Sequence, residues 1–202
     1  SADIHGHWPA AMREALDGSN GVRVDAVTNY AVSGYTSAQA LAAMTANGVG
    51  GYSFCVIGVG TNDIQQGVSV TTCLGNIASM VGLCNAAGAV PVIWIPPLWY
   101  GQAQAGAGTG QATSGSTTGS AIRAAILRYC GANSVACVDM TMVTGPVDVR
   151  YLTQTLGVSG ADPMVRDNIH PTAYCYRLFG FAIARRILGM LCYQPSRAVD
   201  LT

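Results

Sequence analysis

The strongest constraint on the fold is a repeated alternation between short apolar runs and longer helical stretches. Three runs, residues 52–59, 89–95 and 134–140, are rich in β-branched, aromatic and other apolar side chains. The first, YSFCVIGV, is apolar on both faces, as expected of a strand buried in a parallel sheet. Helical stretches lie between and beside these runs, at residues 37–46, 70–87 and 119–129. Such alternation predicts a three-layer α/β/α sandwich with a mostly parallel sheet.

Two further elements complete the predicted order. Residues 22–27 are typical of a short additional strand, and the last helix is expected to open at Pro171, because proline is favoured at the first helical position. Helical spacing predicts an apolar face on that helix made of Tyr174, Leu178, Phe181, Ala182 and Leu188. A chain of 202 residues that is half apolar most simply folds as one domain, so we expect a single domain over residues 1–202.

The charge of the chain excludes several classes of function. Charged residues make up only 10% of the sequence, they sum to zero, and all ten basic residues are Arg. Without Lys there can be no Walker phosphate loop, Schiff-base site or pyridoxal site. Ten Arg balanced by ten acidic residues do not form the basic face that nucleic-acid binding needs. We therefore expect neither a nucleic-acid partner nor a bound cofactor.

The same low charge leaves two explanations for the surface. Too few charges exist to coat a free globule of this size in the ordinary way, so Gly, Ala, Ser and Thr must cover much of it. GC-rich coding is one explanation, and burial of the surface by neighbouring subunits is the other. The most apolar run, residues 89–100, is shorter than the ~20 residues needed to cross a bilayer and contains prolines. We therefore expect no membrane partner.

The cysteines and two of the histidines give little evidence for a metal site. Seven Cys form an odd set without a CxxC pair, and most lie in apolar segments, which favours buried free thiols over disulfides or zinc. Cys130 and Cys137 could still pair across a helix-to-strand turn. His5 and His7 lie two apart in a Gly-containing loop, without a carboxylate or thiolate at a suitable spacing. We expect no bound metal.

An acid and base pair is predicted before the last helix, in the stretch RDNIHPTAYC. Asp167 lies three residues before His170, so its carboxylate can accept the ring N–H and turn the other ring nitrogen toward a substrate. Taken alone, the pair is also compatible with a helix-capping Asp beside a surface His.

Two further residues lie where strands are expected to end. Asn62 follows an apolar strand in IGVGTND, where its amide can point at a developing oxyanion, although ordinary turns also favour Gly, Asn and Asp. Gly34, in NYAVSGYTS, follows the first predicted strand, and its backbone N–H is unobstructed. In open α/β sheets, ligands bind beyond the carboxyl ends of the strands. All these candidates are predicted to gather there.

Together, in this order, the segments resemble the SGNH (GDSL-like) hydrolase family. Gly34 matches the second block of that family, Gly60 and Asn62 the third, and Asp167 with His170 the fifth. The resemblance extends over nearly the whole chain. It implies a flavodoxin-like fold and ester hydrolysis through a Ser nucleophile. His170 would be the general base, Asp167 would orient it, and the Gly34 N–H with the Asn62 amide would form the oxyanion hole.

The first block of the family, a Gly-Asp-Ser turn after a central strand, does not match. HGHWPAAMREAL supplies the following loop and helix, but no apolar strand precedes it. Ser1 can be the nucleophile, Asp3 can occupy that place as a carboxylate, or neither does. We expect an upstream segment, cleaved but still bound or belonging to another chain, to supply the missing strand, because its absence would expose the edges of inner strands.

Two functions follow from these features. One is a serine esterase acting on small acyl groups, such as O-acetyl esters of a polysaccharide, by attack of Ser1 with His170 as base. The other is a structural or glycan-binding module of a larger soluble assembly, such as a virion or a fibre. The low charge and the unmatched first block favour the second.

Overall fold

The computed structural model describes residues 8–19, 21–95, 99–100, 119–144, 147–148 and 173–192. At its centre lies a three-stranded parallel sheet in the order β1-β2-β4. Its strands are β1 (Phe54–Gly58), β2 (Val90–Ile95) and β4 (Ala136–Asp139). Val92 of β2 lies opposite Val56 on one side and Ala136 on the other. The three apolar runs predicted as parallel strands therefore form this sheet.

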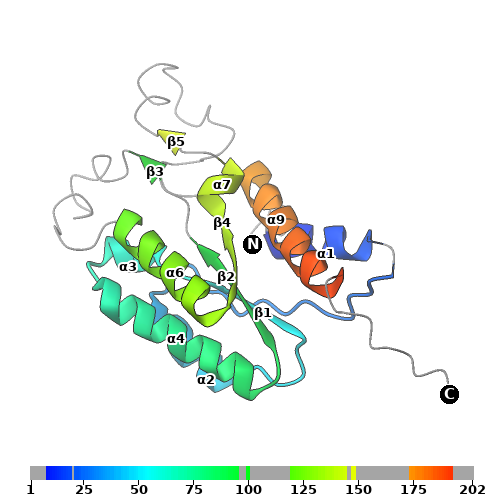
Figure 1. Cartoon of the computed structure of the whole chain (residues 1–202), viewed down its shortest axis with the longest axis horizontal. Coiled ribbons are helices and arrows are strands. Elements are labelled where there is room, and N and C mark those ends of the chain that lie inside the picture. The colour runs from blue at the N-terminus through cyan, green and yellow to red at the C-terminus, as the bar shows by residue number, and fades with distance from the viewer. Residues whose placement is uncertain are drawn as a thin grey trace.

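Helices cover both faces of the sheet (Figure 1). One face carries α2 (Ser37–Asn47), α4 (Val70–Ala86) and α6 (Gly119–Asn133), and the other carries α1 (Trp8–Asp17) and α9 (Ala173–Cys192). The predicted three-layer α/β/α sandwich is confirmed. The shorter elements are α3 (Thr61–Gln65), β3 (Trp99–Tyr100), α7 (Met140–Thr144) and β5 (Val147–Asp148), and β3 pairs with β5 as a separate parallel ribbon. The expectation of one domain over residues 1–202 extends beyond the described ranges and stays a prediction.

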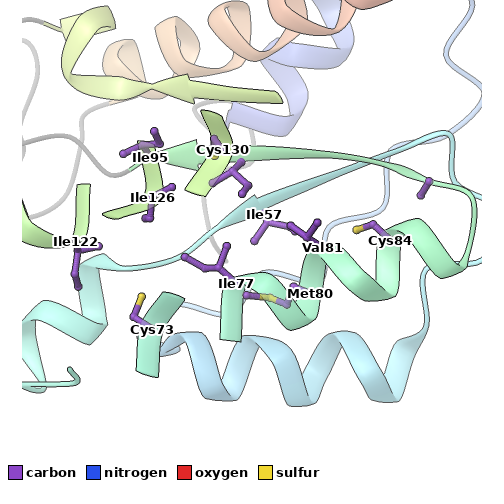
Figure 2. Packing of buried hydrophobic residues seen from close by; sticks show 12 residues of the cluster. Ile57, Cys73, Ile77, Met80, Val81, Cys84, Ile95, Ile122, Ile126 and Cys130 are labelled. Carbon is purple, nitrogen blue, oxygen red and sulfur yellow. The ribbon is translucent and has the colours of Figure 1, made fainter. Parts of the chain in front are cut away.

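The side chains of β2 divide the core into two clusters. Val92 and Trp94 lie in the cluster beneath α1 and α9, whereas Ile93 and Ile95 lie in the cluster beneath α4 and α6. Successive side chains of a strand point to opposite faces, so an uninterrupted apolar run is needed to fill both layers. Figure 2 shows the second cluster, in which Ile77 and Val81 of α4 lie close to Ile57 of β1.

The layer of α1 and α9 depends on small residues that permit close approach. Trp94 lies between Trp8 and Phe179, with ring centroids 5.9 Å and 5.5 Å away. A Cβ on Gly58 would lie 2.6 Å from the Trp94 ring, and a Cβ on Gly180 would lie 2.4 Å from the Trp8 carbonyl oxygen. The two glycines therefore make room for this aromatic cluster and for the contact between the helices.

The predicted strand at residues 22–27 is wrong. The segment makes no backbone ladder with a described strand; instead the Val22 N–H donates to Ser19 O and the Val24 N–H donates to Asp17 Oδ1. Val22, Val24 and Val27 nevertheless pack against the cluster beneath α1 and α9. The three valines are half-buried, so apolar side chains here pack on the core although the backbone makes no strand pairing with a described strand.

Two other expectations concern the edge of the sheet and the last helix. Among the described strands β1 pairs only with β2, so the strand expected from an upstream segment stays a prediction.

The predicted apolar face of α9 is wrong for Leu178, Phe181 and Ala182, which are only half-buried. Leu188 is half-buried and does pack against the cluster beneath α1 and α9, and the side chain of Tyr174 lies outside the described part of the structure. The buried stripe instead contains Cys175, Phe179, Ile183, Ala184 and Ile187. Packing of Phe179 against Trp94 fixes this rotation of the helix. Within the described residues, no helix is long and apolar enough to cross a membrane.

Six cysteines that the structure describes are not in disulfide bonds: Cys55, Cys73, Cys84, Cys130, Cys137 and Cys175. Cys73, Cys84, Cys130 and Cys175 are buried, as predicted. The Cys130 thiol lies against Cys137, and the two are not bonded as a disulfide. A hydrogen bond from Cys130, helped by the nearby Arg186 guanidinium, lowers the pKa of Cys137 to about 7.

We expect Gly180→Ala to destabilise the protein by about 1–3 kcal/mol, because the new methyl group has no space between α9 and α1. The matched control is Gly189→Ala on the same helix, where a Cβ meets nothing within 4 Å. That change should raise stability by up to about 1 kcal/mol through helix propensity. Urea unfolding of both variants measures the difference, and equal effects would contradict the close approach.

We also expect Cys137 to be alkylated with a midpoint near pH 7, since the reactive thiolate forms as pH rises through its lowered pKa of about 7. Tryptic peptide 129–150 contains Cys130 and Cys137 and no other cysteine, so mass spectrometry follows the reaction directly. Cys130→Ala removes the hydrogen-bond donor and should move the midpoint upward. Cys55→Ala should leave it unchanged, and an unmoved midpoint in both variants would contradict the assignment.

Candidate active site

The turn that follows β1 positions Asn62 and Asp63. β1 ends at Gly58, and two residues later Gly60 takes φ +115° and ψ −32°, a conformation suited to glycine. This turn leads directly into α3, so Asn62 and Asp63 lie in its first turn. The sequence predicted a tight turn here; the structure adds a short helix after it.

A second loop, which carries Gly34, lies against this turn. The Tyr35 N–H donates to Val32 O at 3.3 Å, closing a β-turn in which Gly34 has φ +87°. Glycine is favoured at the third position of a type II turn for this reason. Thr36 then caps α2, in a reciprocal pair of hydrogen bonds with Gln39.

Asn62 joins the two loops. Its Nδ2 donates to the carbonyl oxygen of Tyr35 at 3.0 Å, across 27 residues of sequence. Tyr35 directly follows Gly34, so the contact brings the two predicted oxyanion donors into one region. A primary amide carries two N–H groups, and the bond to Tyr35 uses one of them. No hydrogen bond joins the Gly34 N–H to a described residue.

Beneath this contact lies a buried polar network. Asp63 and Ser37 both have an exposed fraction of 0%. The Ser37 N–H donates to Asp63 Oδ2 at 2.9 Å, and the Ser37 hydroxyl donates to Asp63 Oδ1 at 2.5 Å. Asn76 Nδ2, from α4, donates to Ser37 Oγ at 2.9 Å. Burial, together with the charge of Asp63, raises the pKa of the adjacent Cys73 thiol to about 12.

This network was not predicted from the sequence. Asp63 was interpreted only as part of a turn-forming GTND, and Ser37 and Asn76 were not singled out. One signal was available: a carboxylate immediately after a buried strand needs donors, and Thr36-Ser37 at the start of a predicted helix supplies them. The partnership across 26 residues of sequence could not be found from local spacing.

The other candidate residues lie outside the part of the chain that the structure describes. These are Ser1, Asp3, Asp167 and His170, together with His5 and His7. Their roles stay predictions. Within the described ranges, no group of three or more His, Cys, Asp or Glu side chains is arranged to hold a metal ion.

Comparisons with known structures support the fold. A carbohydrate acetylesterase, Est24, from Sinorhizobium meliloti is 15% identical, with a TM-score of 0.62 over 92% of this chain and 86% of that one. An esterase, EstA, from Pseudoalteromonas is 17% identical, with a TM-score of 0.60 over 94% and 90%. A lipolytic protein of the G-D-S-L family from Veillonella parvula is 14% identical, with a TM-score of 0.61 over 94% and 90%.

The sequence comparison gives the family directly. No curated protein matches the chain at a significant level. Residues 2–178, however, match the GDSL-like Lipase/Acylhydrolase family, which covers most of the 202 residues. This range includes both loops described above and the Asp167 and His170 positions. The chain therefore belongs to the GDSL-like lipase and acylhydrolase family.

Proposed function

We propose that this protein is a serine ester hydrolase that acts on small acyl esters. The observation that carries the proposal is the contact of Asn62 with the loop of Gly34 at the carboxyl end of β1. Amide and backbone N–H donors fixed in this way are suited to a developing oxyanion, which is one of the largest contributions to acyl transfer. Membership of an acylhydrolase family supports the same reaction class.

The proposed reaction proceeds in two displacements. The Ser1 hydroxyl attacks the ester carbonyl carbon while His170 takes its proton and Asp167 orients the imidazole. The carbonyl oxygen becomes an oxyanion, held by the Gly34 N–H and the Asn62 amide. Collapse of this intermediate expels the alcohol, which receives the proton from His170. Water then attacks the acyl-enzyme by the same route and releases the carboxylic acid and free Ser1.

We further propose small acyl groups on a carbohydrate, such as O-acetyl esters of a polysaccharide, as substrates. The support is the fold shared with a carbohydrate acetylesterase, at 15% identity.

A second candidate is a structural or glycan-binding module of a larger assembly, such as a virion or fibre. The observation in its favour is the charged fraction of only 10%, which suits a surface covered by neighbours. In this case the edge of β1 would be completed by a strand from an upstream segment or a neighbouring subunit.

We expect Asn62→Ala to lower kcat for a chromogenic acetate ester by about 100-fold to 1,000-fold, with KM nearly unchanged, because the lost donor acts mainly in the transition state. The matched control is Asn47→Ala, since the exposed Asn47 side chain donates only to Ala43 O in its own helix. Steady-state kinetics of both variants provide the measurement. A rise in KM with kcat unchanged would contradict an oxyanion role for Asn62.

A fluorophosphonate reagent separates the two candidate functions. The esterase requires turnover of the acetate ester together with covalent labelling at Ser1, and both should disappear in Ser1→Ala and His170→Ala. Absence of turnover and of labelling selects the binding or structural module. Turnover without labelling at Ser1 would reject Ser1 as the nucleophile.

A further inference from the structure

We propose that Asp63, Ser37 and Asn76 form a positioning network that holds the Gly34 loop and the Asn62 turn at a fixed separation. The inference rests on the proposed function and assigns positioning roles to three residues outside the acid, base and nucleophile set. None of the three is expected to touch the substrate.

Asp63 and Ser37 link the two loops directly. Asp63 directly follows Asn62, and Ser37 lies three residues after Gly34. Two hydrogen bonds, of 2.9 Å and 2.5 Å, join the two oxygens of one carboxylate to the N–H and hydroxyl of one serine. A two-point link fixes orientation as well as distance, because rotation about either bond breaks the other.

The buried carboxylate of Asp63 makes this link costly to break. A carboxylate with no exposed surface is stable only when its oxygens are hydrogen-bonded. Ser37 is the first residue of α2, so its N–H comes from a helix N-terminus, where negative charge is favoured. The ion pairs among the described residues do not include Asp63. Separation of the loops would therefore remove both Ser37 donors from the carboxylate and leave it only the weak donor of the Cys73 thiol, and this penalty keeps the loops together.

Asn76 anchors the link between the loops to α4, which belongs to a rigid helical layer. Asn76 donates to Ser37 Oγ at 2.9 Å, which leaves the hydroxyl hydrogen committed to Asp63. Asn76 lies on α4 next to Ile77, whose exposed fraction is 0% in the core of the second cluster. The network thus ties both loops to a helix that packs directly on the sheet. Oxyanion donors need such preorganisation, since misplacement by about 1 Å can cost 100-fold in rate.

The test uses Ser37→Ala, which removes the hydroxyl but keeps the backbone N–H. We expect kcat for the acetate ester to fall by about 10-fold to 100-fold with KM within about twofold. The matched control is Ser79→Ala, because the Ser79 hydroxyl is exposed and donates only to Gly75 O within α4. Its kinetics should equal those of the unmodified protein. Equal kinetics of both variants would overturn the proposal.

A double-mutant cycle separates positioning from a general structural role. If Ser37 acts by holding the Asn62 donor against the Gly34 loop, the loss in the combined Ser37→Ala and Asn62→Ala variant should be clearly smaller than the product of the two single losses. Losses that multiply would show that Ser37 acts independently of Asn62, and would overturn the positioning role.

Amide hydrogen exchange tests the network separately from the proposed function, because it needs no catalytic activity. If the unmodified protein hydrolyses no ester, amide hydrogen exchange of residues 33–37 and 60–64 still tests the network. Ser37→Ala should speed exchange in both segments by at least about tenfold, with the α9 amides unchanged, whereas Ser79→Ala should not. Unchanged exchange in both segments would overturn the network even in an active enzyme.

Discussion

The arrangement of the candidate site depends on one buried carboxylate. Asp63 has no exposed surface, so it needs donors, and Ser37 supplies two from the beginning of α2. This requirement draws a loop from early in the chain onto the turn that follows β1. Asn62 and Tyr35 meet as a result, at 3.0 Å. The chemistry proposed for the site therefore follows from satisfying a charge that itself does not react.

The sheet supplies the rigid base for this arrangement. β2 is apolar on both faces and fills two separate clusters, so it can be neither shifted nor rotated without exposing one of them. Gly58 and Gly180 admit the Trp94 ring and the close packing of α1 on α9. At the carboxyl end of β1, Gly60 takes a backbone conformation that redirects the chain into α3. The sharp turn after β1, together with the Asp63–Ser37 link, explains how donors from distant segments converge at one edge.

Much of the fold could be predicted from the sequence, and the failures have physical causes. The three central strands were predictable because strands buried on both faces need long apolar runs. Residues 22–27 form only a short run interrupted by Arg23 and Asp25, and they have no backbone partner among the described strands. Asn62 could be singled out by its place after β1, whereas Gly34 was singled out after a strand at residues 22–27 that the structure does not form. The bond between Asp63 and Ser37 could not, because it joins residues brought together only by tertiary structure.

The most direct test of the account is a crystal structure of the protein after reaction with a fluorophosphonate. The account predicts a covalent adduct on Ser1 Oγ whose phosphoryl oxygen lies about 2.7–3.1 Å from both the Gly34 nitrogen and Asn62 Nδ2. Asp63 and Ser37 should keep both of their hydrogen bonds in that adduct. An adduct whose phosphoryl oxygen points away from Gly34 and Asn62, or a protein that forms none, would contradict it.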